Sequence, residues 1–237
     1  MFLGLKDWHG ENIISEIERA AGVSCCLSEE MRDACLFWQD IYQNMAPWLL
    51  EDKDMKSLNL GVGIAREFAR LVTLELKSSV TSQDECSVFA DKVYHRFLSG
   101  ELRRAVERAC ALGGVAMKPF MSDGRIYIDV VDPLDFIPLE SDDDGRITAA
   151  VFISRKDVGK KRYTKIETHR FIGNAESVTN MCYRSPSYST GLGTMCSLSE
   201  VPEWAGLSES FTVTGIHEPL FCYFKMPYSN DIDRNSP

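Results

Sequence analysis

Apolar side chains recur every three or four positions from residue 13 to residue 112, a spacing that is typical of amphipathic helices. Local start and stop signals divide this stretch into five predicted helices. The first ends before Gly22, and the second begins after Ser28, a good N-cap residue, and is ended by Pro47. The other three are expected over about 60–76, from Ser82 or Gln83 to Phe97, and over 101–112.

Each predicted helix has one apolar stripe, the face through which an amphipathic helix packs. Gly113 and Gly114 follow the fifth helix and form a C-terminal stop, because glycine adopts the left-handed conformation without steric strain. The stripes of the last four helices are Met31, Cys35, Trp38, Tyr42 and Met45; Ile64, Phe68, Leu71, Val72 and Leu76; Cys86, Phe89, Val93 and Phe97; and Leu102, Val106, Ala109 and Cys110.

The hydrophobic period falls from about 3.6 to 2 residues at Val115, which indicates strands. Asp-Gly turns at 123–124 and 144–145 predict hairpins over 115–131 and 136–154. The mixed polar strand 161–172 is expected to pair with 177–183, and 184–209 to be mainly loop. Two more strands are predicted at 211–214 and 220–226, and the second is expected to be buried because it is nearly all apolar.

Helices followed by antiparallel strands place the chain in the α+β class. We divide it into a helical segment, residues 1–114, and an antiparallel β-rich segment, residues 115–237, with the join near Gly113. The length of 237 residues suffices for a substantial core. No apolar run is long enough to cross a membrane, and the first residues lack the pattern of a secretory signal.

The net charge of −9 argues against a protein that grips nucleic acid through its phosphates. Eight cysteines are present, none in a C-x-x-C pair, and several lie within apolar periodic segments. We therefore expect reduced, buried thiols rather than a disulfide scaffold.

A search for chemical motifs yields no catalytic, cofactor-binding or metal-ligating constellation. Gly61-Val62-Gly63 lacks the third glycine and the preceding strand of a dinucleotide fingerprint. The acidic run 142–144 lacks the alternating ligands of a calcium loop and is interpreted as a solvated hairpin tip. His169 lies two residues after Glu167 on one face of a strand, an arrangement that is better explained by a cross-strand polar pair than by a metal site.

Residues 108–139 read RACALGGVAMKPFMSDGRIYIDVVDPLDFIPL. This segment resembles portal proteins of tailed bacteriophages that infect Gram-positive bacteria, in which a helix ending in Ala-Leu-Gly-Gly leads into a strand, an Asp-Gly turn and a second strand. Other parts of the chain resemble the family in the same order: residues 37–42, 58–76 and 161–169, and then Trp204 together with residues 219–227. Residues 230–237 resemble the polar stretch that precedes the stem helix.

The resemblance implies a structural role without enzymatic activity, cofactor or active site. A full portal is a dodecameric ring at one capsid vertex, through which DNA is packaged and ejected. Its partners would be further copies of itself, the major capsid and scaffold proteins, the terminase and the head–tail adaptors. The location would be the virion, and the host cytoplasm during assembly.

The resemblance also implies that stem, clip and crown would follow residue 237, so that the chain corresponds to the wing region. Whether that reflects an engineered fragment or a truncated prophage gene stays open. We expect the 237-residue chain alone to be a monomer or small oligomer and not a stable ring, because the family's subunit contacts extend through the stem and crown. The acidic charge is compatible with a wing, which does not line the narrowest DNA path.

Two alternatives remain. One is a metal-dependent nuclease or small hydrolase that uses Glu75, Lys77 or His169, although Glu75 and Lys77 are expected on the solvated face of a helix. The other is an unrelated protein-interaction module in which Trp38, Tyr42 and Trp48 form the binding face. Burial of Trp38 would favour a core helix over a binding face.

Overall fold

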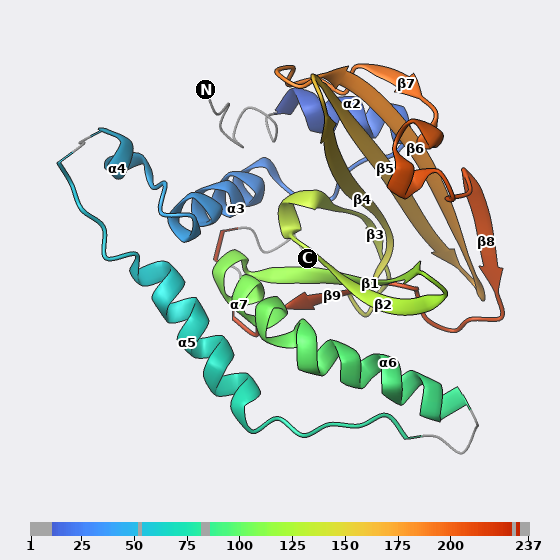
Figure 1. Cartoon of the computed structure of the whole chain (residues 1–237), viewed down its shortest axis with the longest axis horizontal. Helices are drawn as coiled ribbons and strands as arrows, with labels where there is room; N and C mark the ends of the chain where they lie inside the picture. The colour runs from blue at the N-terminus through green and yellow to red at the C-terminus, as the bar shows by residue number, and fades with distance from the viewer. Residues whose placement is uncertain (1–10, 52–53, 82–85, 229–230, 233–237) are drawn as a thin grey trace. The chain divides into compact units, whose positions relative to one another are not determined.

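The computed structural model describes residues 11–51, 54–81, 86–228 and 231–232. Helices come first and antiparallel strands follow, which confirms the predicted α+β class (Figure 1). The helices are α2 (Glu11–Ala21), α3 (Glu29–Tyr42), α4 (Pro47–Glu51), α5 (Leu60–Leu74), α6 (Cys86–Gly100) and α7 (Leu102–Leu112). The predicted start of the fourth helix at Ser82 or Gln83 lies outside the described residues.

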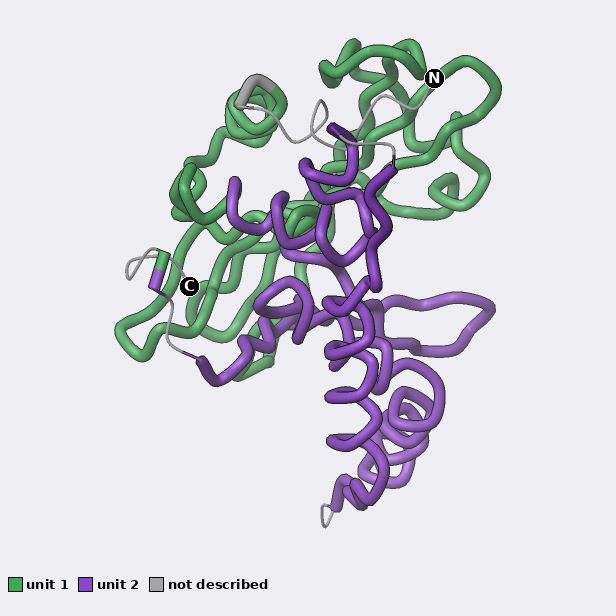
Figure 2. Tube along the Cα trace, turned by 90° about the vertical axis from the view of Figure 1, so that its left-hand side faces the viewer, with its two compact units in different colours: residues 1–32, 134–219, 232–237 green, residues 33–133, 220–231 purple. Residues whose placement is uncertain are grey.

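The chain divides into two compact units, shown in green and purple in Figure 2. Unit 1 comprises residues 1–32, 134–219 and 232–237, and unit 2 comprises residues 33–133 and 220–231. Each unit combines helices with strands, whereas the predicted segments 1–114 and 115–237 follow the order of elements along the chain. The join predicted near Gly113 lies inside unit 2, where α7 leads directly into a strand.

Unit 1 is built on one antiparallel sheet in the order β3-β4-β5-β6-β7, and β8 also pairs with β6. Its two hairpins, β3 with β4 and β5 with β6, are those that the sequence predicts. The predicted loop 184–209 contains a short strand and two 3-10 turns, η2 and η3. The bounds are β3 (Phe136–Ser141), β4 (Ile147–Val158), β5 (Lys161–Ile172), β6 (Ala175–Pro186), β7 (Thr194–Cys196), β8 (Ser210–Thr214), η2 (Leu198–Glu200) and η3 (Pro202–Trp204).

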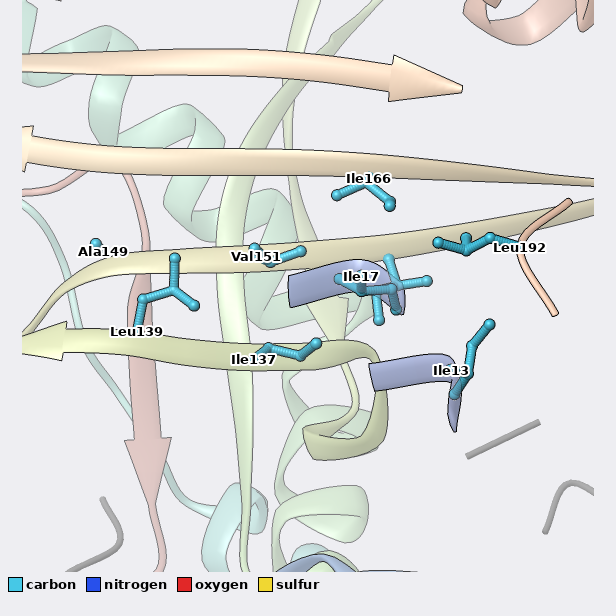
Figure 3. Packing of buried hydrophobic residues seen from close by; sticks show 9 residues of the cluster. Ile13, Ile17, Ile137, Leu139, Ala149, Val151, Ile166 and Leu192 are labelled. Atoms are coloured by element: carbon cyan, nitrogen blue, oxygen red, sulfur yellow. The ribbon is translucent and has the colours of Figure 1, made fainter. Parts of the chain in front are cut away.

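Helix α2 covers one face of this sheet. Ile13 and Ile17 project from α2 onto apolar residues of β3, β4 and β5, among them Ile137, Val151 and Ile166 (Figure 3). A side-chain contact fixes the helix further, because the Glu16 carboxylate accepts a 2.7 Å hydrogen bond from the backbone N–H of Leu192. The helix and the loop before β7 are thereby held on the same core.

Unit 2 contains the sheet β2-β1-β9, with β1 (Gly114–Ser122), β2 (Arg125–Val131) and β9 (Cys222–Lys225). The predicted Asp-Gly turn joins β1 to β2, and Asp123 and Gly124 both have positive φ, as such a hairpin requires. The core of this unit includes Phe97 of α6, Ala109 of α7 and Val115 of β1.

The turn between α7 and β1 depends on two glycines. Gly113 caps the helix at φ +87°, which confirms the predicted stop. A Cβ added at Gly113 would approach the Trp38 ring to 3.3 Å, and one at Gly114 would approach the Tyr223 hydroxyl oxygen to 2.5 Å. The chain therefore passes through a space that only glycine fits.

Three predictions about local structure are wrong. Pro47 does not end the second helix but begins α4, since Asn44 has already turned left-handed at φ 59° and the N–H of Met45 bonds back to Asp40. Strand β9 is largely exposed, because it forms the edge of a small sheet. The apolar stripe of α5 is mostly exposed as well, and the buried side of that helix carries Val62, Ala65 and Ala69.

Among the described residues, none of the helices combines the length and the hydropathy that crossing a membrane requires. All eight cysteines are free in the structure. Their expected burial holds only in part, since just Cys35 and Cys182 are buried and Cys26, Cys86 and Cys222 are exposed.

Candidate functional site

A row of ionisable side chains lies on one face of β5. Every second residue of β5 points to the same face, and Ile166 packs against α2. The side chains of Lys165, Glu167 and His169 therefore project to the face opposite α2. All three are less than a tenth exposed, although the sequence predicts a polar strand with both faces mixed. Burial of charged groups is tolerated only when they are paired.

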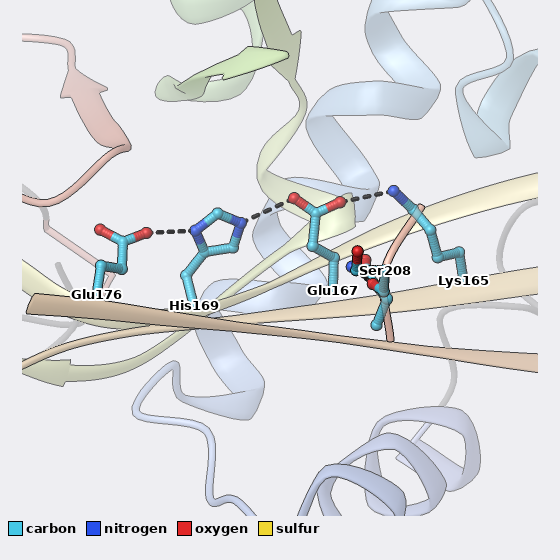
Figure 4. A network of polar contacts seen from close by, with 6 residues as sticks. Lys165, Glu167, His169, Glu176 and Ser208 are labelled. Atoms are coloured by element: carbon cyan, nitrogen blue, oxygen red, sulfur yellow. Dashed lines mark hydrogen bonds and ion pairs between the residues drawn. The ribbon is translucent and has the colours of Figure 1, made fainter. Parts of the chain in front are cut away.

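The pairing is continuous along the row (Figure 4). Lys165 Nζ lies 2.6 Å from Glu167 Oε2, and Glu167 Oε1 lies 2.8 Å from His169 Nε2. The other imidazole nitrogen, Nδ1, lies 2.5 Å from Oε1 of Glu176, a fully buried residue of β6. The predicted cross-strand polar pair of His169 is therefore confirmed, with Glu176 as a partner that the sequence reasoning missed.

The two carboxylates constrain the protonation of His169. Each ring nitrogen faces a carboxylate oxygen, and a neutral imidazole carries only one N–H. Both contacts are hydrogen bonds only when the ring is an imidazolium or one carboxyl group keeps its proton. The cluster can hold a proton between β5 and β6, and it ties the two strands together.

The same geometry does not suit a metal ion. The two nitrogens of one imidazole point in different directions, and each faces a different glutamate. No single ion could therefore bind Glu167, Glu176 and a nitrogen of His169 at once. Within residues 11–51, 54–81, 86–228 and 231–232, no group of three or more His, Cys, Asp and Glu side chains is placed to hold a metal.

Glu75 and Lys77, the other residues of the hydrolase alternative, lie just after the end of α5, and both are exposed. They belong to unit 2, whereas His169 belongs to unit 1. Within the described residues, no contact joins Glu75 or Lys77 to a side chain that could complete a catalytic or metal site.

The aromatic residues of the interaction-module alternative do not form one face. Trp38 is half-buried and lies against Gly113, while Tyr42 donates a 2.7 Å hydrogen bond to Glu107 of α7. Only Trp48 is exposed, and it meets Phe37 edge to face with ring centroids 6.1 Å apart. Trp38 and Tyr42 thus attach α3 to the rest of unit 2.

A cavity of about 390 Å³ opens beside Tyr42 between α3 and α7. Arg108 in its wall is paired with Asp132, and Glu107 accepts hydrogen bonds from both Tyr42 and Arg66. The charged residues of the wall are Arg104, Arg108, Glu107 and Asp132, so its formal charges cancel and do not point to an ionic ligand.

The exposed stripe of α5 is the surface that most clearly lacks a partner within the described structure. Leu60, Ile64, Leu71 and Leu74 are 65%, 66%, 59% and 63% exposed. With Glu67 they follow steps of four and three residues, the spacing of a helix that packs along another helix. We call these four apolar residues the α5 stripe.

The opposite side of α5 explains why the stripe is left uncovered. Val62, Ala65 and Ala69 are buried where α5 packs along α7, and Gly61 lies against Ile41 of α3. Small residues allow the two helices to approach closely, so the larger residues point away from the unit. The predicted apolar stripe shares Ile64 and Leu71 with the α5 stripe. Periodicity alone does not show which side of the helix the rest of the unit covers.

Comparison with known proteins gives no further guide to the site: no protein-family model matches the chain, and no curated protein sequence matches it.

Proposed function

We propose that this chain is the wing region of a bacteriophage portal, a structural component of the ring through which DNA is packaged and ejected. The proposal rests on the resemblance of residues 108–139 and on the α5 stripe. It assigns no catalytic chemistry to the chain. Its location would be the portal vertex of the virion.

The elements that occupy the resembling segments support the proposal. Residues 108–139 contain the end of α7, the Gly113 turn, and the hairpin of β1 and β2 with its Asp-Gly turn. Residues 161–169 lie in β5, and residues 219–227 include β9. This order of helix, turn and strands agrees with what the resemblance implies for residues 108–139.

The single observation that carries the assembly role is the exposure of the α5 stripe. Contiguous apolar patches on a protein surface mark interaction sites, and the α5 stripe places four exposed apolar residues on one helix face. A neighbouring subunit of the ring would cover this stripe with an apolar helix or sheet face. Capsid shell and scaffold would contact other surfaces of the wing, and the terminase and head–tail adaptors would dock on regions outside this chain.

To test the proposal, the coding sequence is expressed together with the source DNA that follows codon 237. The protein product is then examined by negative-stain electron microscopy. Rings with a central channel support the proposal, and particles that stay monomeric in packaging buffer contradict it. The matched variant Leu71→Lys, on the α5 stripe, is expected to weaken ring formation. Glu75→Lys, an exposed position just beyond the helix, is its control.

The chain of 237 residues alone gives a second check. Light scattering is expected to show a monomer or a small oligomer, and a stable dodecamer would contradict the role assigned to the stem and crown. Plasmid cleavage with magnesium or manganese that a chelator stops, and that Glu75→Ala abolishes, would replace the structural proposal with a nuclease.

A further inference from the structure

Two cysteines face each other across neighbouring strands of unit 1. Cys182 of β6 and Cys196 of β7 are register partners in an antiparallel ladder, and their sulfur atoms lie 3.4 Å apart. Directly opposed residues in such a ladder have Cα atoms about 4.5 or 5.5 Å apart, and both separations are within the range that a disulfide spans. Small side-chain rotations suffice to bring the sulfurs to bonding distance.

The backbone around the pair is held in place from both sides. Gly193 precedes β7 at φ +81°, and a Cβ there would come within 2.2 Å of the Arg184 carbonyl oxygen. After β7, Leu198, Val201 and Trp204 pack with Cys182 in one apolar cluster. The facing sulfurs are therefore a consequence of the fold and not of a free loop.

The two thiols differ in access to solvent. Cys182 is 1% exposed, whereas Cys196 is only partly buried on a strand of three residues at the sheet edge. A reagent in solution reaches Cys196 first, and Cys182 is then the thiol closest to it.

We propose that Cys182 and Cys196 are a thiol pair that small disulfide compounds, such as oxidised glutathione, convert into an intramolecular disulfide. The Cys196 thiolate attacks one sulfur of the reagent, forms a mixed disulfide and releases one molecule of reduced thiol. The Cys182 thiolate then attacks the Cys196 sulfur, forms the Cys182–Cys196 bond and releases the second reduced thiol. Two protein thiols are oxidised, one reagent disulfide is reduced, and the two thiol protons pass to the released thiols.

The environment sets the pH dependence of this exchange. Burial raises the pKa of Cys182 to about 12, and burial also raises the pKa of Cys196. Because the thiolate is the attacking species, oxidation accelerates as the pH rises. The facing geometry decides which two of the eight thiols become joined.

The bond would fix the segment that carries Trp204. Strand β7 pairs with β6 at only three positions, and Tyr163 and Arg184 hold η2 through Glu200 by contacts of 3.1 and 2.8 Å. A covalent link at Cys196 adds a constraint that does not depend on these contacts. The inference stands on this geometry alone and is independent of the portal proposal.

The test incubates the reduced 237-residue chain with oxidised glutathione, alkylates the remaining thiols and maps the peptides by mass spectrometry without reduction. Digestion combines trypsin with a glutamate-specific protease. Trypsin cleaves after Arg184 and separates Cys182 from Cys196, and the second protease cleaves after Glu200 and separates Cys196 from Cys222. The expected product is a joined pair of peptides that contains only Cys182 and Cys196 and lacks two hydrogen atoms. The oxidised chain is expected to melt about 5 °C or more above the reduced chain.

Cys196→Ser removes the joined peptides, and Cys222→Ser, a matched change at an exposed cysteine of β9, leaves them intact. Cys196→Ser tests the link without disturbing the buried Cys182. The inference is overturned if Cys182 and Cys196 are recovered alkylated while exposed cysteines carry glutathione. A stable glutathione adduct on Cys196, or a link from either cysteine to another partner, overturns it too.

Discussion

The Tyr42 hydroxyl donates a 2.7 Å hydrogen bond to Oε1 of Glu107, across 65 positions of the chain. The same carboxylate oxygen accepts a 3.1 Å hydrogen bond from Arg66 Nε of α5. One carboxylate therefore joins three helices of unit 2 that the sequence separates widely. The contribution of this carboxylate to the stability of unit 2 can be measured by substituting each of its partners in turn.

Tyr42→Phe removes this hydrogen bond and keeps the ring. We expect the free energy of unfolding to fall by about 1 to 2 kcal/mol, because the bond goes to a charged acceptor that is only partly solvated. Urea denaturation measures the change. Tyr188→Phe, at a residue that is 74% exposed, is the control and should match the wild type within about 0.5 kcal/mol.

The pH dependence of stability should report on the same tyrosine. Burial, followed by the hydrogen bond to Glu107, raises the pKa of Tyr42 from 10.0 to about 12. A raised folded-state pKa gives stability that is complete below pH 10.0 and is lost as the pH rises through about 12. Wild-type unfolding free energy should therefore fall more steeply across this window than that of Tyr42→Phe. Parallel curves for the two proteins would contradict the assignment.

Two glycine substitutions should have opposite signs. Gly113→Ala places a side chain at φ +87° and near the Trp38 ring, and should destabilise the protein by about 1 to 2 kcal/mol. Gly63→Ala lies inside α5 with open space around its Cβ, and should stabilise by about 0.5 to 1 kcal/mol. Thermal or urea unfolding distinguishes them, and two changes of equal sign would argue against the left-handed cap.

The two sides of α5 should respond differently to substitution. Ala69→Leu overfills the fully buried contact with α7 and should destabilise by about 1 to 3 kcal/mol. Leu71→Lys lies on the α5 stripe and should change the unfolding free energy of the chain by about 0.5 kcal/mol or less. A large loss in Leu71→Lys would mean that the stripe is covered within the chain itself.

The cluster around His169 should be sensitive to loss of one carboxylate. Glu176→Gln keeps the volume but replaces the carboxyl group that faces His169 Nδ1 with an amide, and should cost about 3 to 5 kcal/mol because the remaining groups stay buried. Glu203→Gln breaks an exposed contact with Lys156 and serves as the control with little effect. Equal effects of the two variants, measured by urea denaturation, would show that the buried cluster contributes no more than a surface pair.

The sequence predicted the positions of the elements better than their surroundings. Helix stops and Asp-Gly turns act through the local backbone, so Gly113 and the two hairpins were predictable. Burial depends on partners elsewhere in the chain. The α5 stripe has the period of a core face, yet Ala65 and Ala69 on the other side are what α7 covers.

The candidate site shows the same limit. Glu167 and His169 are two residues apart and so share a strand face. A polar pair that includes His169 was predictable from this spacing alone. Glu176 joins them only because β5 turns back into β6, and its place depends on the register of that hairpin. The facing of Cys182 and Cys196 likewise depends on register, and no motif in the sequence marks it.

The strands that pair with the outer edge of β6 affect how readily this sheet can add a strand from another molecule. This strand of twelve residues is paired along part of its outer edge by β7 and along another part by β8, strands of three and five residues. At the opposite side of the sheet, β3 carries Pro138 and an irregular register. Short, interrupted edges are poor templates for a strand from another molecule. A strand from another molecule would meet only short or irregular partners at the edges of this sheet, which disfavours edge-to-edge aggregation.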